Sequence, residues 1–246
     1  RRPPPPSPAP GGGTPFQWKE GLIEVNRYTF KEKGTRVGEI EQRLYGVKGE
    51  KNRPVFKVIF ELIRQARMKG KEPLVGRSTT EILFDPETLD LLSKSESYSI
   101  ADTEARIRIS KTPTGFRTTQ ESYALGSPRP PEVKELTFEA DTPLVDQMVV
   151  GYMVRKMAGE EGRTFSLNAI NPVREGILHL KGKVGRIVPM ELDGHPMEAW
   201  RVDVASPKGT TTYYVQPGEE RSLLRYVASN GEVYELQNAG GSRKED

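Results

Sequence analysis

The residues best suited to catalysis in this sequence are its two histidines, because an imidazole can gain or lose a proton near neutral pH and can also bind a metal. His179 lies in an alternating, strand-like run, and His195 lies in the turn-like run 193–196. Neither is part of a His-x-x-x-His or Glu-x-x-His pattern, which would place two metal ligands on one helix face. We therefore interpret both histidines as structural or solvent-facing.

Other catalytic arrangements are also missing from the sequence. There is no Gly-x-Ser-x-Gly motif, and the glycine cluster at 182–186, which we predict to be a turn, lacks the Gly-Lys-Ser/Thr that holds a nucleotide. The carboxylate pairs at 160–161 and 219–220 are adjacent in loops instead of converging from separate elements. The chain has no cysteine, which excludes disulfides, thiol nucleophiles and cysteine-held metals. We predict a protein that is not an enzyme and needs no metal or other cofactor.

The charge pattern argues against nucleic acid as a partner. The net charge is only +3, from 37 basic and 34 acidic residues that are interleaved along the chain. A basic run around Arg106, Arg108 and Arg117 could contact a single strand, but Glu104 and Glu121 interrupt it. No stretch approaches the roughly 18 consecutive apolar residues of a transmembrane segment.

Alternating polar and apolar residues predict that β-strands dominate. Over 103–110 Ala105, Ile107 and Ile109 face one way and charged residues face the other, which is typical of a half-buried antiparallel strand. Over 55–63 one face is wholly apolar, so that strand should be central. We expect a turn at Asp85-Pro86-Glu87 and a two-residue hairpin turn at Asn230-Gly231, which would place Val227 opposite Tyr234.

One segment breaks this pattern, and its composition predicts a helix over 142–158. Apolar residues cover most of its circumference, and Gln147, Gly151 and Arg155 form a polar stripe. Such a helix needs cover on several sides, so we predict a mainly β fold in which a curved antiparallel meander sheet, or open half-barrel, wraps one central helix. The residues expected to line a cavity between helix and sheet are Met148, Tyr152, Met153 and Met157 on the helix, with Trp200, Phe60 and Phe138 as the facing wall.

The two ends of the chain differ from its body. Residues 1–15 are rich in proline and glycine, and 239–246 form a polar tail, so neither can bury enough surface to fold. We expect a disordered tether, a single β domain over 16–238 and a disordered tail. The chain begins at Arg1 with no signal segment, and we expect that an upstream export signal has been removed.

The order of segments resembles an uncharacterised family of bacterial exported β proteins, domain of unknown function 3108. The resemblance covers roughly residues 37–238 and rests on the helical segment from Asp146 to Tyr152 and on the runs at 184–189, 199–202 and 224–236. It implies a fold similar to the half-barrels that carry lipoproteins or acyl chains in the bacterial envelope, and a periplasmic or otherwise exported location. The family supplies no catalytic residues to carry over.

Together these features favour a non-enzymatic cell-envelope protein that binds a lipid, lipoprotein or other apolar ligand. One alternative is a structural or assembly module that docks partners on its sheet edges and has no cavity. A lesser alternative is a hydrolase of envelope polymers, which would need a cleft where carboxylates converge and one carboxyl has a raised pKa.

Overall fold

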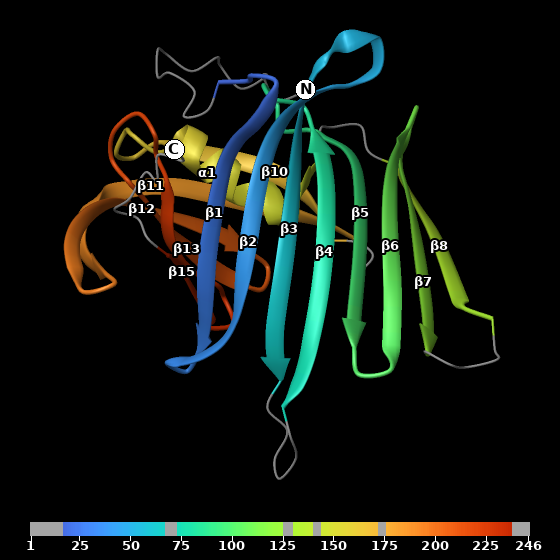
Figure 1. Ribbon diagram of the computed structural model, residues 1–246. Helices are drawn as coiled ribbons and strands as arrows, with labels where there is room; N and C mark the ends of the chain where they lie inside the picture. Colours follow the sequence, from blue (N-terminus) through green and yellow to red (C-terminus); the bar gives the residue numbers. More distant parts are fainter. Residues whose placement is uncertain (1–16, 67–72, 125–129, 140–143, 172–175, 238–246) are drawn as a thin grey trace.

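The described strands form one open, curved sheet of fifteen strands (Figure 1). The computed structural model describes residues 17–66, 73–124, 130–139, 144–171 and 176–237, so the expected tether and tail lie outside the described residues. Eight strands follow one another as an antiparallel meander: β1 (Gly21–Glu32), β2 (Thr35–Lys48), β3 (Pro54–Ala66), β4 (Leu74–Phe84), β5 (Leu91–Ile100), β6 (Thr103–Thr112), β7 (Gly115–Ala124) and β8 (Glu132–Glu139). A short 3-10 turn, η1 (Glu50–Asn52), separates β2 from β3.

The remaining strands form a second meander that returns to the first. They are β9 (Leu144–Asp146), β10 (Thr164–Asn171), β11 (Gly176–Leu192), β12 (His195–Ser206), β13 (Gly209–Val215), β14 (Leu223–Val227) and β15 (Val233–Leu236). The last strand, β15, pairs antiparallel with the first, β1, from Tyr28 opposite Leu236 to Lys31 opposite Val233. This junction joins the two meanders into one sheet whose edges are β8 and β9.

The helix is shorter than the sequence suggests. Residues 144–146 form strand β9, which pairs in parallel with β10, and the helical part consists of a 3-10 turn, η2 (Gln147–Val149), and α1 (Val150–Met157). A parallel pair of strands needs a crossover connection, and α1 provides it on the concave side of the sheet (Figure 1). The prediction of a helix was wrong at residues 144–146, because a short apolar run is compatible with a buried strand as well as with a helix. The sheet is therefore mixed, although all its other pairings are antiparallel.

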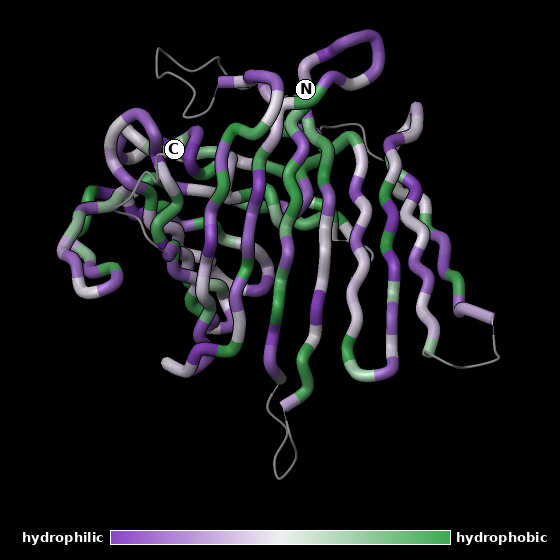
Figure 2. The backbone as a smooth tube through the Cα atoms, in the orientation of Figure 1, coloured by the Kyte–Doolittle hydropathy of each residue, from purple (hydrophilic) through white to green (hydrophobic). Residues whose placement is uncertain are grey.

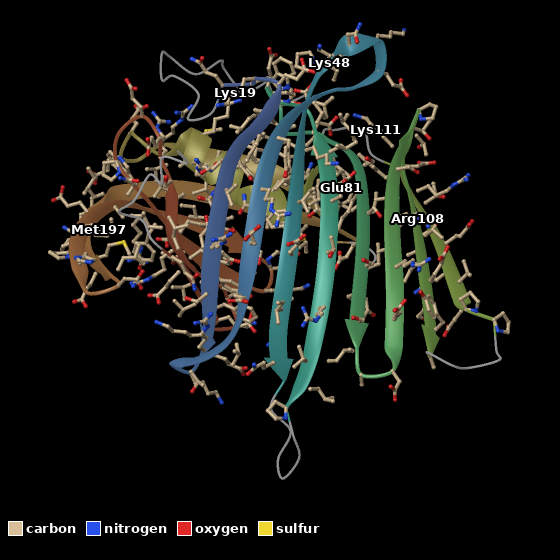
Figure 3. The ribbon with its side chains drawn as sticks, viewed as in Figure 1. Lys19, Lys48, Glu81, Arg108, Lys111 and Met197 are labelled. Atoms are coloured by element: carbon tan, nitrogen blue, oxygen red, sulfur yellow. The ribbon has the colours of Figure 1, made fainter. Side chains whose placement is uncertain are left out.

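The predicted alternation of buried and exposed side chains is confirmed on the larger meander. Ala105, Ile107 and Ile109 are at most 1% exposed, and Phe56 and Val58 on β3 are equally buried. Figure 2 shows the matching alternation of hydrophilic and hydrophobic residues along the front strands. Charged side chains such as Glu81 and Arg108 occupy the outer face (Figure 3). The core therefore lies on the concave side, between the sheet and α1.

The turn predicted at Asp85 is confirmed, and the hairpin at Asn230 differs by one residue. Asp85 Oδ1 accepts hydrogen bonds from the backbone N–H groups of Glu87 and Thr88 at 2.9 and 3.0 Å, which ends β4. Residues 228–232 connect β14 to β15, and the Ala228 N–H donates to the Glu232 carbonyl at 2.8 Å, which encloses a three-residue turn, 229–231. Within this turn only Gly231 has a positive φ (85°), whereas a two-residue turn of type I′ needs two. Tyr234 consequently lies opposite Tyr226, not opposite Val227.

The glycine cluster at 182–186 is part of strand β11, not a turn. A Cβ on Gly182 would lie 2.0 Å from Cζ of Phe165, so this glycine allows an aromatic ring to lie flat against the neighbouring strand. Gly185 falls between Val184 and Ile187, where the pairing of β11 with β12 shifts register at a bulge. The glycines thus serve close packing and a bend inside a strand, which local sequence cannot distinguish from a turn.

Candidate ligand-binding pocket

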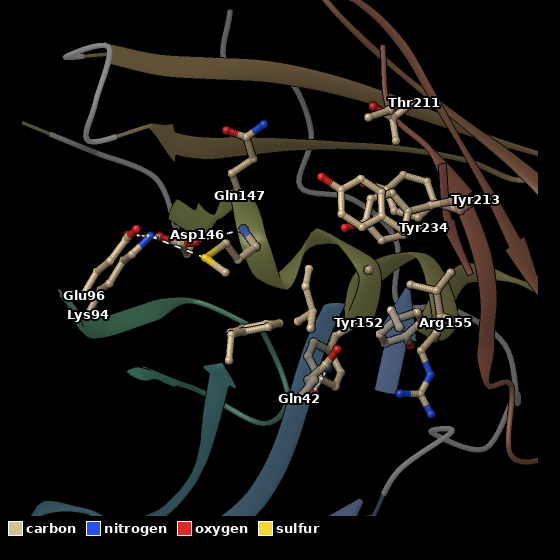
Figure 4. A pocket seen from close by; sticks show the side chains of 18 residues that line it. Gln42, Lys94, Glu96, Asp146, Gln147, Tyr152, Arg155, Thr211, Tyr213 and Tyr234 are labelled. Carbon is tan, nitrogen blue, oxygen red and sulfur yellow. Dashed lines mark hydrogen bonds and ion pairs between the residues drawn. The ribbon is translucent and has the colours of Figure 1, made fainter. Parts of the chain in front are cut away.

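A pocket of about 340 Å³ lies on the concave side of the sheet, between the η2–α1 segment and strands from both meanders (Figure 4). Gln147 and Met148 line it and are exposed, so the pocket reaches the surface beside η2. Aromatic and aliphatic side chains make up most of its wall. The lining residues are Tyr28, Ile40, Gln42, Phe60, Lys94, Glu96, Asp146, Gln147, Met148, Gly151, Tyr152, Arg155, Thr211, Tyr213, Leu223, Tyr226, Ala228 and Tyr234.

A row of stacked aromatic rings on four neighbouring strands, which we call the aromatic ladder, forms one side of the pocket: Tyr213, Tyr226 and Tyr234 line the pocket, and Phe30, which is fully buried, continues the row into the core. Successive ring centroids are 5.7, 4.2 and 5.1 Å apart, with interplanar angles of 26°, 8° and 20°. The rings stack because each lies directly opposite the next in the register of β13, β14, β15 and β1. Such pairs are worth about 0.5–1.5 kcal/mol beyond their buried area, so the ladder holds this wall rigid.

Polar contacts fix the β1 end of the ladder. The Arg64 guanidinium lies 5.7 Å from the centre of the Phe30 ring and donates to Glu232 Oε1 at 2.7 Å. The Tyr234 hydroxyl donates to the other carboxylate oxygen of Glu232 at 2.8 Å. Burial alone would raise the pKa of Glu232, but these hydrogen bonds and the Arg64 charge outweigh it and lower that pKa.

A buried charged cluster lies at one end of the pocket, where Lys94 on β5 meets two carboxylates. The Lys94 Nζ is 3.1 Å from Glu96 Oε2 and 3.3 Å from Asp146 Oδ2, and the side chains of Lys94 and Asp146 are 4% and 1% exposed. Asp146 also caps η2 by accepting a hydrogen bond from the Met148 N–H at 2.8 Å. Burial raises the pKa of Asp146, and Lys94 offsets only part of that rise. Burial alone would lower the pKa of Lys94, but the two carboxylates raise it above its ordinary value.

Arg155 on α1 lies at the other end of the pocket (Figure 4). Its guanidinium donates to Glu24 Oε2 at 2.8 Å and to the backbone carbonyls of Arg221 and Glu220 at 2.8 and 3.2 Å. It also lies 5.7 Å from the centre of the Tyr152 ring. Burial alone would lower the pKa of Arg155, but Glu24 more than compensates, so the pKa is raised and the residue stays charged.

Comparison with known proteins shows that the fold of this chain is similar to that of a solved structure. No family model and no curated protein matches the chain. A solved structure is similar to it. That structure is a β-barrel-like protein of domain of unknown function DUF1849 from Brucella abortus, with a TM-score of 0.53, 11% sequence identity, and coverage of 87% of this chain and 94% of that one.

This likeness shows the fold alone. It supports the expected similarity to an uncharacterised β-barrel-like protein and a mainly β, open curved sheet. It does not support domain of unknown function 3108 in particular, because the similar structure carries a different family designation.

Three of the seven residues expected to line a cavity do so: Met148, Tyr152 and Phe60. Met153, Met157 and Trp200 are partly buried against the core but do not line the pocket. Phe138 lies on β8 opposite Phe116, and its side chain lies outside the described residues. The η2–α1 segment therefore faces the pocket through Met148 and Tyr152 and also through the stripe of Gln147, Gly151 and Arg155, which we predicted to be its polar side.

The tyrosines of the ladder and the two charged clusters were missed from the sequence. Tyr213, Tyr226 and Tyr234 are nearby in sequence and carry an alternating strand pattern, but a hairpin register one residue off turns Tyr234 away from Tyr226. Lys94 and Asp146 are 52 positions apart in the sequence, and no sequence pattern predicts that their side chains are in contact. No sequence signal could have found the ladder with certainty, because Asn230-Gly231 suits a two-residue turn and also a three-residue turn with glycine in the left-handed position.

The residues considered for catalysis lie away from the pocket. His179 and His195 are exposed, as predicted, and His179 Nδ1 lies 2.6 Å from the side-chain oxygen of Asn168. Glu160, Glu161 and Glu219 are exposed in loops. Across the described ranges no group of three or more His, Asp or Glu side chains is arranged to hold a metal ion. Within the same ranges no helix is both long and apolar enough to cross a bilayer.

Proposed function

We propose that this protein is a non-enzymatic binding protein that holds a lipid, a lipoprotein acyl chain or another apolar molecule in the pocket between the sheet and the η2–α1 segment. The observation that carries the proposal is the pocket itself, which reaches the surface and has an aromatic wall built from four strands. Ligand sites in proteins are typically concave, mostly apolar and pre-formed, with volumes of roughly 300–1,000 Å³.

The size of the pocket is sufficient for such a ligand. Its volume of about 340 Å³ is more than twice that of the roughly 150 Å³ engineered cavity that takes up benzene. Burial of each methylene group contributes about 0.8 kcal/mol, so even a short chain would gain several kcal/mol on entry. The rigid ladder adds to this, because a pre-formed wall needs little ordering when the ligand binds.

The proposal that the site is not catalytic is supported by the pairing of its ionised groups. Lys94 lies between Glu96 and Asp146, and Arg155 is held by Glu24 and two backbone carbonyls. A catalytic acid or base must be within hydrogen-bond reach of the reacting group. Here the ionised groups are engaged in holding η2 and α1 in place.

The test is to fill the pocket and measure uptake of an apolar probe. Ala228 lines the pocket and is only partly buried, so Ala228→Trp should abolish binding of N-phenyl-1-naphthylamine without unfolding the protein. The matched control is Ala205→Trp on β12, which is exposed and does not line the pocket. Native mass spectrometry of the purified protein should also reveal a bound apolar molecule. Equal probe binding by wild type and a folded Ala228→Trp variant would refute the proposal.

A hydrolase acting on envelope polymers is a second candidate function, and one observation favours it. Asp146 and Glu96 converge on Lys94 at the pocket wall, and burial raises the pKa of Asp146, as a general acid would require. Asp146→Asn keeps a side-chain oxygen for capping η2 and removes the acid. Loss of reducing-end release from envelope polysaccharide by this variant, with apolar probe binding intact, would favour the hydrolase.

An assembly role through the sheet edge is the third candidate. Strand β8 is an edge of the sheet, its pairing within the described residues is with β7 only, and Val133 on it is 55% exposed. Such an edge can accept a strand from a partner. Val133→Pro should abolish a complex seen by native mass spectrometry if this function is correct, and should leave apolar probe binding unchanged.

We further propose that the protein works in the bacterial cell envelope after export. This rests on the sequence resemblance to exported β proteins and on a pocket suited to envelope lipids. Fractionation of cells that make the full-length protein tests it, because a cytoplasmic location would exclude this role.

A further inference from the structure

Three tyrosine hydroxyls in the pocket wall have no hydrogen-bond partner among the described residues: those of Tyr28 on β1, Tyr213 on β13 and Tyr226 on β14. The other two tyrosines that line the pocket are bonded, Tyr152 to Gln42 and Tyr234 to Glu232. Tyr28 is only 3% exposed, and burial raises the pKa values of Tyr28, Tyr213 and Tyr226, so all three remain protonated donors at neutral pH.

These hydroxyls are open to the pocket and are not sealed inside the protein. The side-chain oxygen and nitrogen atoms that are fully enclosed without a hydrogen-bond partner in the described part of the chain belong to Thr80, Thr112, Thr118, Asp146 and Arg225. None of the three tyrosines is among them. Three donors that face an open pocket without a protein partner are suited to a ligand that accepts hydrogen bonds, because such a ligand replaces the water that otherwise satisfies them.

The charges around the pocket indicate that this acceptor is uncharged. Each cation of the lining is paired with carboxylate, Lys94 with Glu96 and Asp146, and Arg155 with Glu24 at 2.8 Å. An anionic headgroup would therefore meet no unpaired cation among these groups. Anion sites instead use unpaired Arg or Lys side chains or clustered backbone N–H groups.

We infer that the ligand is a neutral amphipathic lipid, with its ester or amide carbonyl bound by the hydroxyls of Tyr28, Tyr213 and Tyr226 and its chain held by the apolar wall. This inference rests on the proposed function and specifies its ligand class. The aromatic ladder fixes two of the donors, because the rings of Tyr213 and Tyr226 stack 5.7 Å apart and cannot turn independently. The carbonyl is therefore recognised by pre-positioned donors, which gives selectivity over a plain hydrocarbon.

The experiment compares three probes of similar chain length that differ in their polar group: methyl decanoate, decanoate at neutral pH, and undecane. Each is measured by displacement of N-phenyl-1-naphthylamine from the full chain. The wild type should bind methyl decanoate more tightly than decanoate or undecane. Tyr213→Phe and Tyr226→Phe keep the ladder rings and remove the donors, so each should weaken methyl decanoate about two- to tenfold and change undecane less than twofold.

Tyr214→Phe is the matched control. Tyr214 is the next residue on β13, points to the opposite face from Tyr213 and does not line the pocket, so this change should leave all three affinities unaltered. Unchanged methyl decanoate binding in both pocket variants, or tighter wild-type binding of decanoate than of its ester, would overturn the inference while leaving the proposed function intact. Failure of the wild type to bind any of the probes would overturn both.

Discussion

Replacing Arg155 by methionine should destabilise the protein strongly, because the guanidinium joins three parts of the fold. It connects α1 to Glu24 on β1 and to the carbonyls of residues 220 and 221, which precede β14. Its side chain is 5% exposed and that of Glu24 is 19% exposed, so the substitution leaves a mostly buried carboxylate without its cation. Removing one partner of a buried ion pair costs about 3–5 kcal/mol, and methionine keeps a flexible apolar stem in place of the arginine methylenes, so the loss comes mainly from the missing guanidinium.

The free energy of unfolding is best measured by urea denaturation, with the fluorescence of Trp18 and Trp200 as the probe. The midpoint should fall while the slope stays constant, because the surface exposed on unfolding does not change. Arg155→Lys should recover only part of the loss, since one ammonium cannot reach the three acceptors that the planar guanidinium reaches. Glu24→Gln combined with Arg155→Met should cost less than the two separate changes added together.

The control is the exposed ion pair of Arg36 and Glu39, whose side chains are 57% and 51% exposed and whose separation is 2.9 Å. Arg36→Met should change the free energy of unfolding by no more than about 0.5 kcal/mol, because water solvates both groups when the pair is broken. A loss below about 1 kcal/mol for Arg155→Met, or equal losses for the two variants, would contradict the assignment of Arg155 as a buried connector.

Two further predictions concern packing and pH. Gly182→Ala should lower the free energy of unfolding in urea by about 1–3 kcal/mol, because its Cβ would lie 2.0 Å from the Phe165 ring. The double variant Gly182→Ala/Phe165→Leu should lose less stability than the two single variants added together. Additive losses would refute the contact. Gly76→Ala is its control, since the nearest atom would be 3.6 Å away. The pKa of Glu232 is lowered in the folded protein, so its stabilising contribution is present above its ordinary pKa of 4.5 and is lost as pH falls below it. Glu232→Gln should therefore flatten the fall of the unfolding free energy below about pH 4.5, and an unchanged acid slope would contradict this.

Much of the sheet was predictable because strand alternation is a local property. Ile107 and Ile109 face the core for the same reason that the arginines beside them face water, and no distant residue is needed to know it. The turn at Asp85 was equally local, because its carboxylate satisfies backbone N–H groups two and three residues ahead. The order of strands was not predictable, because β1 and β15 pair across almost the whole chain.

The candidate site was predicted only in part, for two physical reasons. The segment at 144–146 becomes a strand because β10 offers it backbone partners, which shortens the helix. The face that α1 presents to the pocket carries Gly151, Tyr152 and Arg155 and not Met153 or Met157. At the β14–β15 hairpin a register error of a single residue exchanges the faces of the strand, which hides the stacking of Tyr226 and Tyr234. A site that is assembled from strands far apart in the sequence therefore depends on the exact register of each strand pair, which cannot be predicted from composition.

The pairing of β1 with β15 has a consequence for how the protein is made. Each meander consists of strands that are neighbours in sequence, so each can begin to form while the ribosome is still extending the chain. The pocket draws Tyr28 from the first meander and Tyr213 and Tyr226 from the second, so it cannot exist until residues 233–236 have left the ribosome and paired with β1. Until that moment β1 is an open edge, and binding competence should arise in the final step of folding.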